Sequence, residues 1–219
     1  MTYEYGPLSR SIEETLTTIQ GWLMREYRAE FLPACRRSPR RTRRLRRMRG
    51  WIREIDRLVS GIDRVKRVTL PRIERDTGYA FQDPDGLLRI LMDNSTRRLF
   101  SGIPEGFPED RLPIPAKDID MLGKFPDDAR ALALIGDVTL RLKVLSGPHA
   151  GVPGLAPLSD RWKLHESKIG LECRHRPVGR ALEQEKEILA VAVLGLLYVE
   201  GGIDVLRAAV PLLACGPAG

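Results

Sequence analysis

The residues of this chain that most clearly suggest a chemistry are arginines crowded into one short segment. Nine arginines fall within the 14 residues from Arg36 to Arg49, and the segment contains no acidic residue. Arginine binds phosphate through paired hydrogen bonds, and a cluster of arginines gains free energy when a polyanion releases its counterions on binding. The candidate nucleic-acid-binding residues are therefore Arg36, Arg37, Arg40, Arg41, Arg43, Arg44, Arg46, Arg47 and Arg49.

The basic character of the chain is confined to this segment. The formal net charge is +7, but without the nine arginines 27 Lys and Arg residues face 29 Asp and Glu residues. Arginines crowded at the start of a helix repel one another and oppose the helix dipole, so folding alone does not favour them. A solvated helix surface and a docking site for an acidic protein remain alternatives. Charge does not distinguish RNA from DNA, and Trp51 alone provides no row of aromatic rings for stacking single strands.

Size and composition fit one large domain, or one domain with an appendage. The 219 residues are 42% hydrophobic, which is enough for a sizeable core. Cys35, Cys173 and Cys215 form no C-x-x-C pair, which favours a reducing compartment. The longest apolar run, from Ile188 to Val199, has 12 residues and is too short to span a bilayer. We therefore expect a cytoplasmic protein without membrane association.

Residues 1–69 are expected to form a basic helical hairpin that presents the arginines. Apolar residues repeat there at spacings of three and four, the pattern of a helix with one buried face. In the first helix these residues are Ile12, Leu16, Ile19 and Leu23. In the second helix they are Leu45, Met48, Ile52, Ile55, Val59 and Ile62. The second helix should begin at Ser38-Pro39 and end near Val68, with Pro71 at the boundary of the next domain.

Residues 70–219 also have a helical pattern, interrupted by segments rich in glycine and proline. We predict loops over residues 100–126 and 146–158. The predicted helices span residues 83–99, 127–145, 160–174, 181–200 and 204–213. Gly201-Gly202 should end the fourth of these helices. Since no stretch alternates strictly between apolar and polar residues, we expect an all-α fold.

Three segments of residues 70–219 carry motifs in a characteristic order. The first places a glycine, a tyrosine, a phenylalanine, an aspartate and two leucines at Gly78, Tyr79, Phe81, Asp83, Leu87 and Leu88. The second is Leu132-Ala-Leu-Ile-Gly-Asp-Val-Thr-Leu140, and the third runs from Glu187 to Gly202 and ends in Tyr-Val-Glu-Gly-Gly. Together they resemble the ribonuclease III domain. The resemblance implies a ribonuclease III-like helical core, itself all-α, and a protein of RNA processing that contacts double-stranded RNA.

The resemblance also implies a metal site, most of whose carboxylates this chain lacks. The family uses four carboxylates to hold magnesium or manganese beside the phosphate. The corresponding residues here are Ala133, Asp137, Ile188 and Val191. Asp137 is thus the candidate catalytic and metal-binding residue. Glu187, one turn before Val191, is the candidate relocated acid, together with Glu183. Alternatively, Asp137 only pairs with Arg141 at the next helical turn.

Three functions remain open. The first is an RNA-binding protein, specific for double-stranded or structured RNA, with a degenerate catalytic site and no cofactor; Ala133, Ile188 and Val191 would then pack together around Asp137. The second is a magnesium- or manganese-dependent endoribonuclease. The third is a non-catalytic structural or assembly protein. The resemblance implies a homodimer, and we expect the basic hairpin to replace the double-stranded-RNA-binding domain that commonly follows this core.

Overall fold

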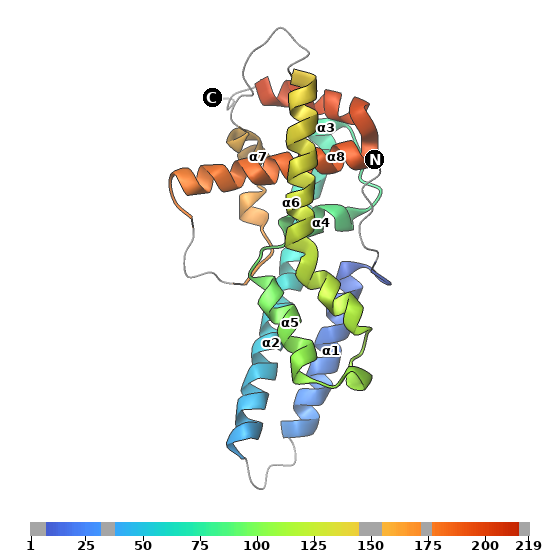
Figure 1. Ribbon diagram of the computed structural model, residues 1–219, viewed down its shortest axis with the longest axis vertical. Coiled ribbons are helices and arrows are strands. Elements are labelled where there is room, and N and C mark those ends of the chain that lie inside the picture. Colours follow the sequence, from blue (N-terminus) through green and yellow to red (C-terminus); the bar gives the residue numbers. More distant parts are fainter. Residues whose placement is uncertain (1–7, 32–37, 145–154, 172–176, 215–219) are drawn as a thin grey trace.

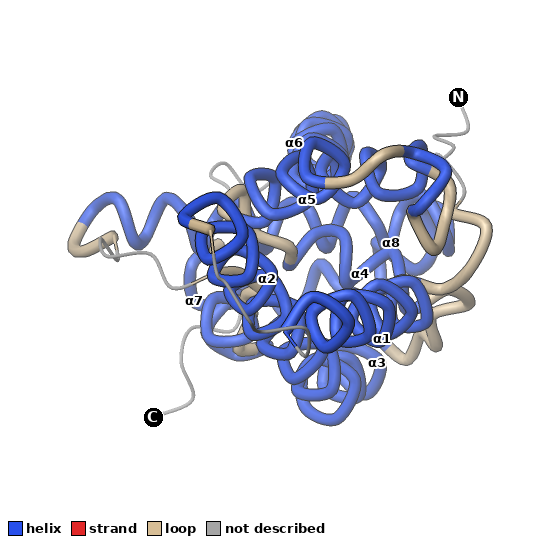
Figure 2. The backbone as a smooth tube through the Cα atoms, turned by 90° about the horizontal axis from the view of Figure 1, so that it is seen from below, coloured by secondary structure: helices blue, strands red, loops and turns tan. Residues whose placement is uncertain are grey.

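The computed structural model of the protein describes residues 8–31, 38–144, 155–171 and 177–214. The predicted all-α class is confirmed: the described residues contain helices and loops, without a strand, and a single isolated bridge joins Met92 and Ile169 (Figure 2). The molecule is elongated, with α1, α2 and α5 in its lower part and α3, α4, α7 and α8 in its upper part (Figure 1). Helix α6 runs along the long axis and joins the two parts.

The N-terminal hairpin consists of α1, Ile12–Phe31, and α2, Pro39–Arg64, which lie side by side and antiparallel (Figure 1). All four predicted apolar residues of α1 are fully buried. In α2 the predicted stripe is buried or half-buried, and Trp51 and Leu58 extend it. The start of α2 is also as predicted, because the Ser38 side chain accepts a hydrogen bond from the backbone N–H of Arg41 and Pro39 follows as the first helical residue. The apolar spacing therefore decided the face on which the two helices meet.

The helical path does not end near Val68 or Pro71 as predicted. A π-helical segment, Val65–Thr69, follows α2 and leads directly into α3, Leu70–Thr77. Pro71 lies within the first two residues of α3, directly after the π-helical segment, and does not end the helical path. The path ends instead at Gly78, whose left-handed conformation, φ 69°, suits a glycine.

The predicted helix over residues 83–99 is divided into α4, Pro84–Leu91, and α5, Thr96–Gly106. The division results from pairing with a distant segment. The Ile169 N–H donates to the Leu91 carbonyl at 2.8 Å, and the Asp93 N–H donates to the Ile169 carbonyl at 2.7 Å. Met92 between them is extended, so the helix cannot continue.

Residues 100–126 are largely helical, which contradicts the predicted loop. Helix α5 extends to Gly106, a 3₁₀ turn covers Glu109–Arg111, and α6 spans Ala116–Val144. Pro126 lies inside α6, and the lower part of this helix is bent (Figure 1). Ile119, Leu122 and Phe125 are fully buried just before the proline. The burial of these large side chains offsets the lost hydrogen bond.

The predicted helix over residues 160–174 is also absent within the described residues. Helix α7, Ala156–Trp162, ends earlier because Lys163 is left-handed, and a 3₁₀ turn, His165–Ser167, follows. The predicted helix over residues 181–200 is confirmed as the first arm of α8, Arg180–Ala214. Gly202, at φ 74°, produces a kink after which a second arm covers the predicted segment 204–213.

Helix α8 has the length and the apolar composition that could cross a membrane over Arg180–Ala209, on those two criteria alone. Its apolar residues have partners inside the protein, however. Ala190 and the residues from Ala192 to Leu197, Gly195 included, are buried. The most extensive helix contact in the molecule is that between α6 and α8, and α7 packs against α8 as well. Packing in the core thus accounts for these buried residues, whereas Ile188 in the same helix is 48% exposed.

Candidate nucleic-acid interface

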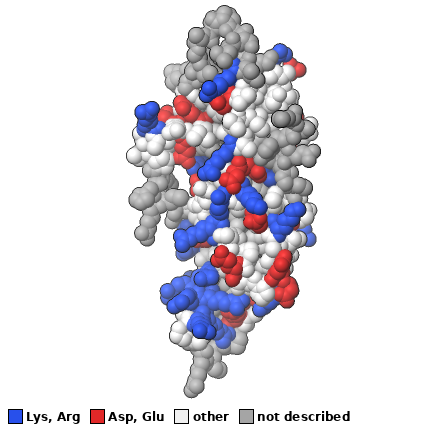
Figure 3. Space-filling model, viewed as in Figure 1, with Lys and Arg blue, Asp and Glu red and all other residues white. Residues whose placement is uncertain are grey.

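The arginine segment forms the first turns of α2, and the densest group of basic side chains in Figure 3 lies over this lower end. Five arginines are exposed there, and we call them the arginine face: Arg40, Arg43, Arg46, Arg47 and Arg49. At 3.6 residues per turn they cover about half of the helix circumference. Since the start of a helix carries partial positive charge, its dipole adds to their attraction for anions. Arg36 and Arg37 lie outside the described residues.

Two further arginines of the segment are engaged inside the protein. Arg41 donates a hydrogen bond to the backbone carbonyl of Glu30. The Nε of Arg44 lies 3.0 Å from a carboxylate oxygen of Glu30, and its guanidinium lies 4.8 Å from the ring centre of Phe107. Both cations thus neutralise the C-terminal end of α1. They tie α2 to its neighbours, so the predicted set of nine contains members with a structural role.

The residues that the resemblance compares with metal-binding carboxylates lie near the crossing of α6 and α8, where the two backbones are in contact. A Cβ atom built on Gly136 would lie 2.1 Å from the carbonyl oxygen of Val191. A Cβ atom built on Gly195 would lie 2.1 Å from the carbonyl oxygen of Leu132. Only glycine permits this approach at either position. Backbone atoms therefore occupy the space between the helices at the crossing.

Asp137 lies beside the crossing and points to solvent. Its side chain is 46% exposed and accepts a hydrogen bond from the Arg141 Nε at 3.0 Å. The alternative that Asp137 pairs with Arg141 is therefore confirmed. Within the described residues no group of three or more histidine, cysteine, aspartate or glutamate side chains is arranged to hold a metal ion.

The expected packing of Ala133, Ile188 and Val191 around Asp137 is wrong. Ala133 and Val191 pack against the core, but Ile188 is 48% exposed. The Ile188 side chain therefore faces water and does not pack around Asp137. The glutamates proposed as relocated ligands are not gathered there either: Glu183 pairs with Lys186 at 3.1 Å, and Lys186 also pairs with Asp160 at 3.0 Å. Glu187 is half-buried one turn before Val191.

A cluster of charged residues that the sequence did not indicate joins the α4–α5 break to α8. The Lys168 ammonium lies 2.7 Å from the Asp93 carboxylate and also contacts Glu185. His165 lies 3.4 Å from the same Glu185. Burial lowers the pKa of Lys168, but the hydrogen bonds with Asp93 and Glu185 outweigh burial and raise it. Because the Lys168 ammonium lies between the Asp93 and Glu185 carboxylates, the cluster holds these segments together.

Among the acids that the structure describes, Glu200 has the most strongly shifted pKa, although the resemblance matches it only to a position that is not catalytic. Burial and the nearby charge of Asp83 raise the pKa of Glu200 to about 7, although a hydrogen bond from the Gln82 backbone lowers it. One of its carboxylate oxygens is buried without a hydrogen-bond partner, as is the Tyr79 hydroxyl, among the described residues. The first and third sequence motifs thus meet in space: a Cβ atom built on Gly86 would lie 2.9 Å from the Glu200 carboxylate. Their separation along the chain concealed this contact.

Comparisons with known proteins assign no family to the chain. No protein-family model matches it, no curated protein matches its sequence, and no solved structure matches it. The resemblance to the ribonuclease III domain rests on the three sequence segments alone.

Proposed function

We propose that the protein binds double-stranded or structured RNA through the arginine face and does not cleave it. The observation that carries the proposal is the arginine face itself. Its five exposed guanidinium groups cover about half of the circumference of α2 at its N-terminal end, with no acidic residue among them. Such an arrangement is electrostatically unfavourable in the free protein and becomes favourable when phosphates lie against it. The preference for RNA over DNA rests on the ribonuclease III resemblance.

The absence of cleavage is proposed from the surroundings of Asp137. Cleavage by a metal-assisted mechanism requires several carboxylates that converge on one phosphate. Asp137 is paired with Arg141, and the residues at the other three family positions carry no carboxylate. A solvent-exposed aspartate that is already paired has little affinity for a divalent cation.

The same proposal includes a homodimer. The large apolar side chains of Leu134 and Val138 in α6 and Ile188 in α8 are 65%, 48% and 48% exposed. Leu134 and Val138 lie one helical turn apart, and Ile188 lies one turn before Val191 at the α6–α8 crossing. Contact with a second copy would remove these side chains from water. Light scattering should then give about twice the 24.7 kDa mass of one chain.

The salt dependence of RNA binding tests the proposed function. Fluorescence anisotropy with a labelled RNA duplex at several KCl concentrations should give a log–log slope of about −4 to −5, since each neutralised phosphate contributes about −0.9. Changing Arg40, Arg43 and Arg46 to glutamine should flatten the slope by about 3. A DNA duplex of the same sequence measures the preference for RNA.

A control variant with the same net charge separates the arginine face from general basicity. It changes three exposed arginines of α6 and α8 to glutamine, namely Arg141, Arg180 and Arg207. This control should keep the wild-type slope. Equal slopes for the wild type and the arginine-face variant would mean that phosphates bind elsewhere, and the proposal would fail.

A further inference from the structure

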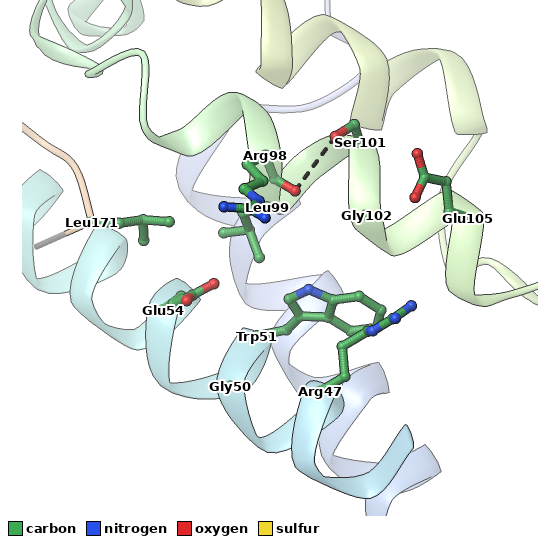
Figure 4. A pocket seen from close by; sticks show the side chains of 10 residues that line it. All are labelled: Arg47, Gly50, Trp51, Glu54, Arg98, Leu99, Ser101, Gly102, Glu105 and Leu171. Atoms are coloured by element: carbon green, nitrogen blue, oxygen red, sulfur yellow. Dashed lines mark hydrogen bonds between the residues drawn. The ribbon is translucent and has the colours of Figure 1, made fainter. Parts of the chain in front are cut away.

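A groove of about 630 Å³ opens between α2 and α5, next to the arginine face (Figure 4). Arg47, Gly50, Trp51 and Glu54 line it from α2, and Arg98 and Gly102 line it from α5. Arg47 belongs to the arginine face as well, so a strand bound along that face would pass the mouth of the groove. The volume falls in the range of sites that hold small organic ligands.

The polar groups of the groove are of two kinds. Arg47, Arg98, Ser101 and the acid Glu105 are exposed, whereas the acid Glu54 is half-buried. Burial raises the pKa of Glu54, although the charges of Arg53 and Arg57 lower it. Among the described residues no hydrogen bond or ion pair engages the carboxylate of Glu54 or the guanidinium of Arg98. The groove thus presents the partly desolvated Glu54 carboxylate as an acceptor, two cations with planar faces, and the exposed Glu105 carboxylate.

The walls of the groove contain a glycine that packing does not require. Gly50 lies inside α2, and a Cβ atom built on it would meet no atom within 4 Å. Glycine inside a helix is destabilising relative to alanine, so open space alone gives no reason for it. Its effect here is a smooth wall that a flat group can approach closely. Trp51, which is 7% exposed, forms the floor, and its ring lies 5.9 Å from the Arg47 guanidinium.

These features fit one nucleotide. A phosphate suits Arg47 and Arg98, and the planar guanidinium groups can stack on a base. Among the bases, guanine carries two adjacent donors, N1–H and the N2 amino group, on its pairing edge. A single carboxylate such as that of Glu54 can accept both. Adenine offers only one donor there.

We infer that the α2–α5 groove holds one unpaired guanine nucleotide of the RNA strand that lies along the arginine face. The inference rests on the proposed function and specifies its ligand. Structured RNA is read mainly at bulges and loops, where an unstacked base is accessible. Glu54 then acts as the residue that selects the base, while the arginine face contributes affinity for any duplex.

The test compares RNA hairpins that differ in one nucleotide. Fluorescence anisotropy is measured for hairpins with the same stem that carry a single bulged guanine, a single bulged adenine or no bulge. We expect the guanine bulge to bind about tenfold more tightly than the adenine bulge, the discrimination typical of a paired contact to a base. Glu54→Gln should abolish this difference, while the unbulged hairpin still binds through the arginine face.

Two glycine variants provide a matched pair. Gly50→Leu places a side chain in the groove and should abolish the preference for the guanine bulge. Gly21→Leu, inside α1, also fills open space but lies outside the groove, and should retain the preference. Both substitutions replace a glycine inside a helix by a good helix former, so both variants should fold.

The outcomes separate this inference from the proposed function. If the hairpins bind equally tightly with either bulge, and Glu54→Gln changes nothing, the inference is overturned while RNA binding by the arginine face stands. If no hairpin binds, the proposed function fails, and the inference about a strand fails with it. Titration with guanosine monophosphate completes the test. If the wild type binds this nucleotide, Glu54→Gln removes the binding, and no hairpin is preferred, then the groove holds a free nucleotide and the inference that it holds a nucleotide of an RNA strand is overturned.

Discussion

The substitution Glu200→Gln should stabilise the protein at neutral and alkaline pH. Burial, and then the charge of Asp83, raise the pKa of Glu200 from 4.5 to about 7 in the folded protein. Between these two values the folded protein keeps a proton that the unfolded chain has released. The free energy of unfolding contributed by Glu200 therefore falls as the pH rises through this window. Below pH 4.5 the group is protonated in both states and has no such effect.

The expected size of the effect follows from the same two pKa values. A difference of one pH unit corresponds to about 1.4 kcal/mol, so ionising Glu200 in the folded state costs about 3 kcal/mol at most. Because the side chain is only half-buried, solvent screens the charge, and we halve the cost to about 1.5 kcal/mol. Glutamine has the same shape without the charge. For a chain of this length the gain corresponds to about 3–6 °C in melting temperature.

Thermal unfolding followed by circular dichroism at pH 5, 6, 7 and 8 measures this effect. The difference in melting temperature between Glu200→Gln and the wild type should be small at pH 5 and largest at pH 8. Glu109→Gln, at an exposed glutamate, is the control and should differ from the wild type by the same small amount at every pH. A difference for Glu200→Gln that stays constant from pH 5 to pH 8 would refute the reasoning.

Two further predictions concern the α6–α8 crossing. Gly136→Ala should lower the free energy of unfolding in urea by about 3 kcal/mol, because its Cβ atom would overlap the carbonyl oxygen of Val191. Gly21→Ala, whose Cβ atom lies in open space, should raise the free energy of unfolding by about 1 kcal/mol. Similar changes in both variants would contradict the close crossing. With magnesium or manganese, the wild type should cut duplex RNA no faster than Asp137→Asn. This substitution should lower the free energy of unfolding by less than about 0.5 kcal/mol, since it removes only an exposed ion pair. If the wild type cuts duplex RNA and Asp137→Asn abolishes the cutting, the protein is an endoribonuclease instead. If Glu187→Gln also abolishes the cutting, Glu187 is a second catalytic acid.

The sequence alone determined those features that depend on short spacings. The apolar stripes of α1 and α2, the capping by Ser38 and Pro39, and the first arm of α8 follow from residues within a few turns of one another. The arginine segment was visible for the same reason, and its place at the start of a helix followed from the cap. Helical periodicity is a local property, so it can be read before the fold is known.

Tertiary contacts decided the limits of the other helices. Residues 83–99 have a helical pattern, yet Ile169 pairs with the backbone at Leu91 and Asp93 and divides them. Proline and glycine predicted a loop before Pro126, yet burial of apolar side chains keeps α6 helical through that residue. In both cases an interaction between distant segments outweighs the local preference.

The candidate site also depends on contacts that the sequence does not reveal. Nine arginines were equivalent in the sequence, but Glu30 engages Arg41 and Arg44 and leaves the arginine face to the others that the structure describes. The residues around Glu200 in the sequence do not indicate that burial and the charge of Asp83 raise its pKa. Residue types and their spacing give the available charges, whereas exposure, pairing and desolvation arise only when segments far apart in the sequence come together.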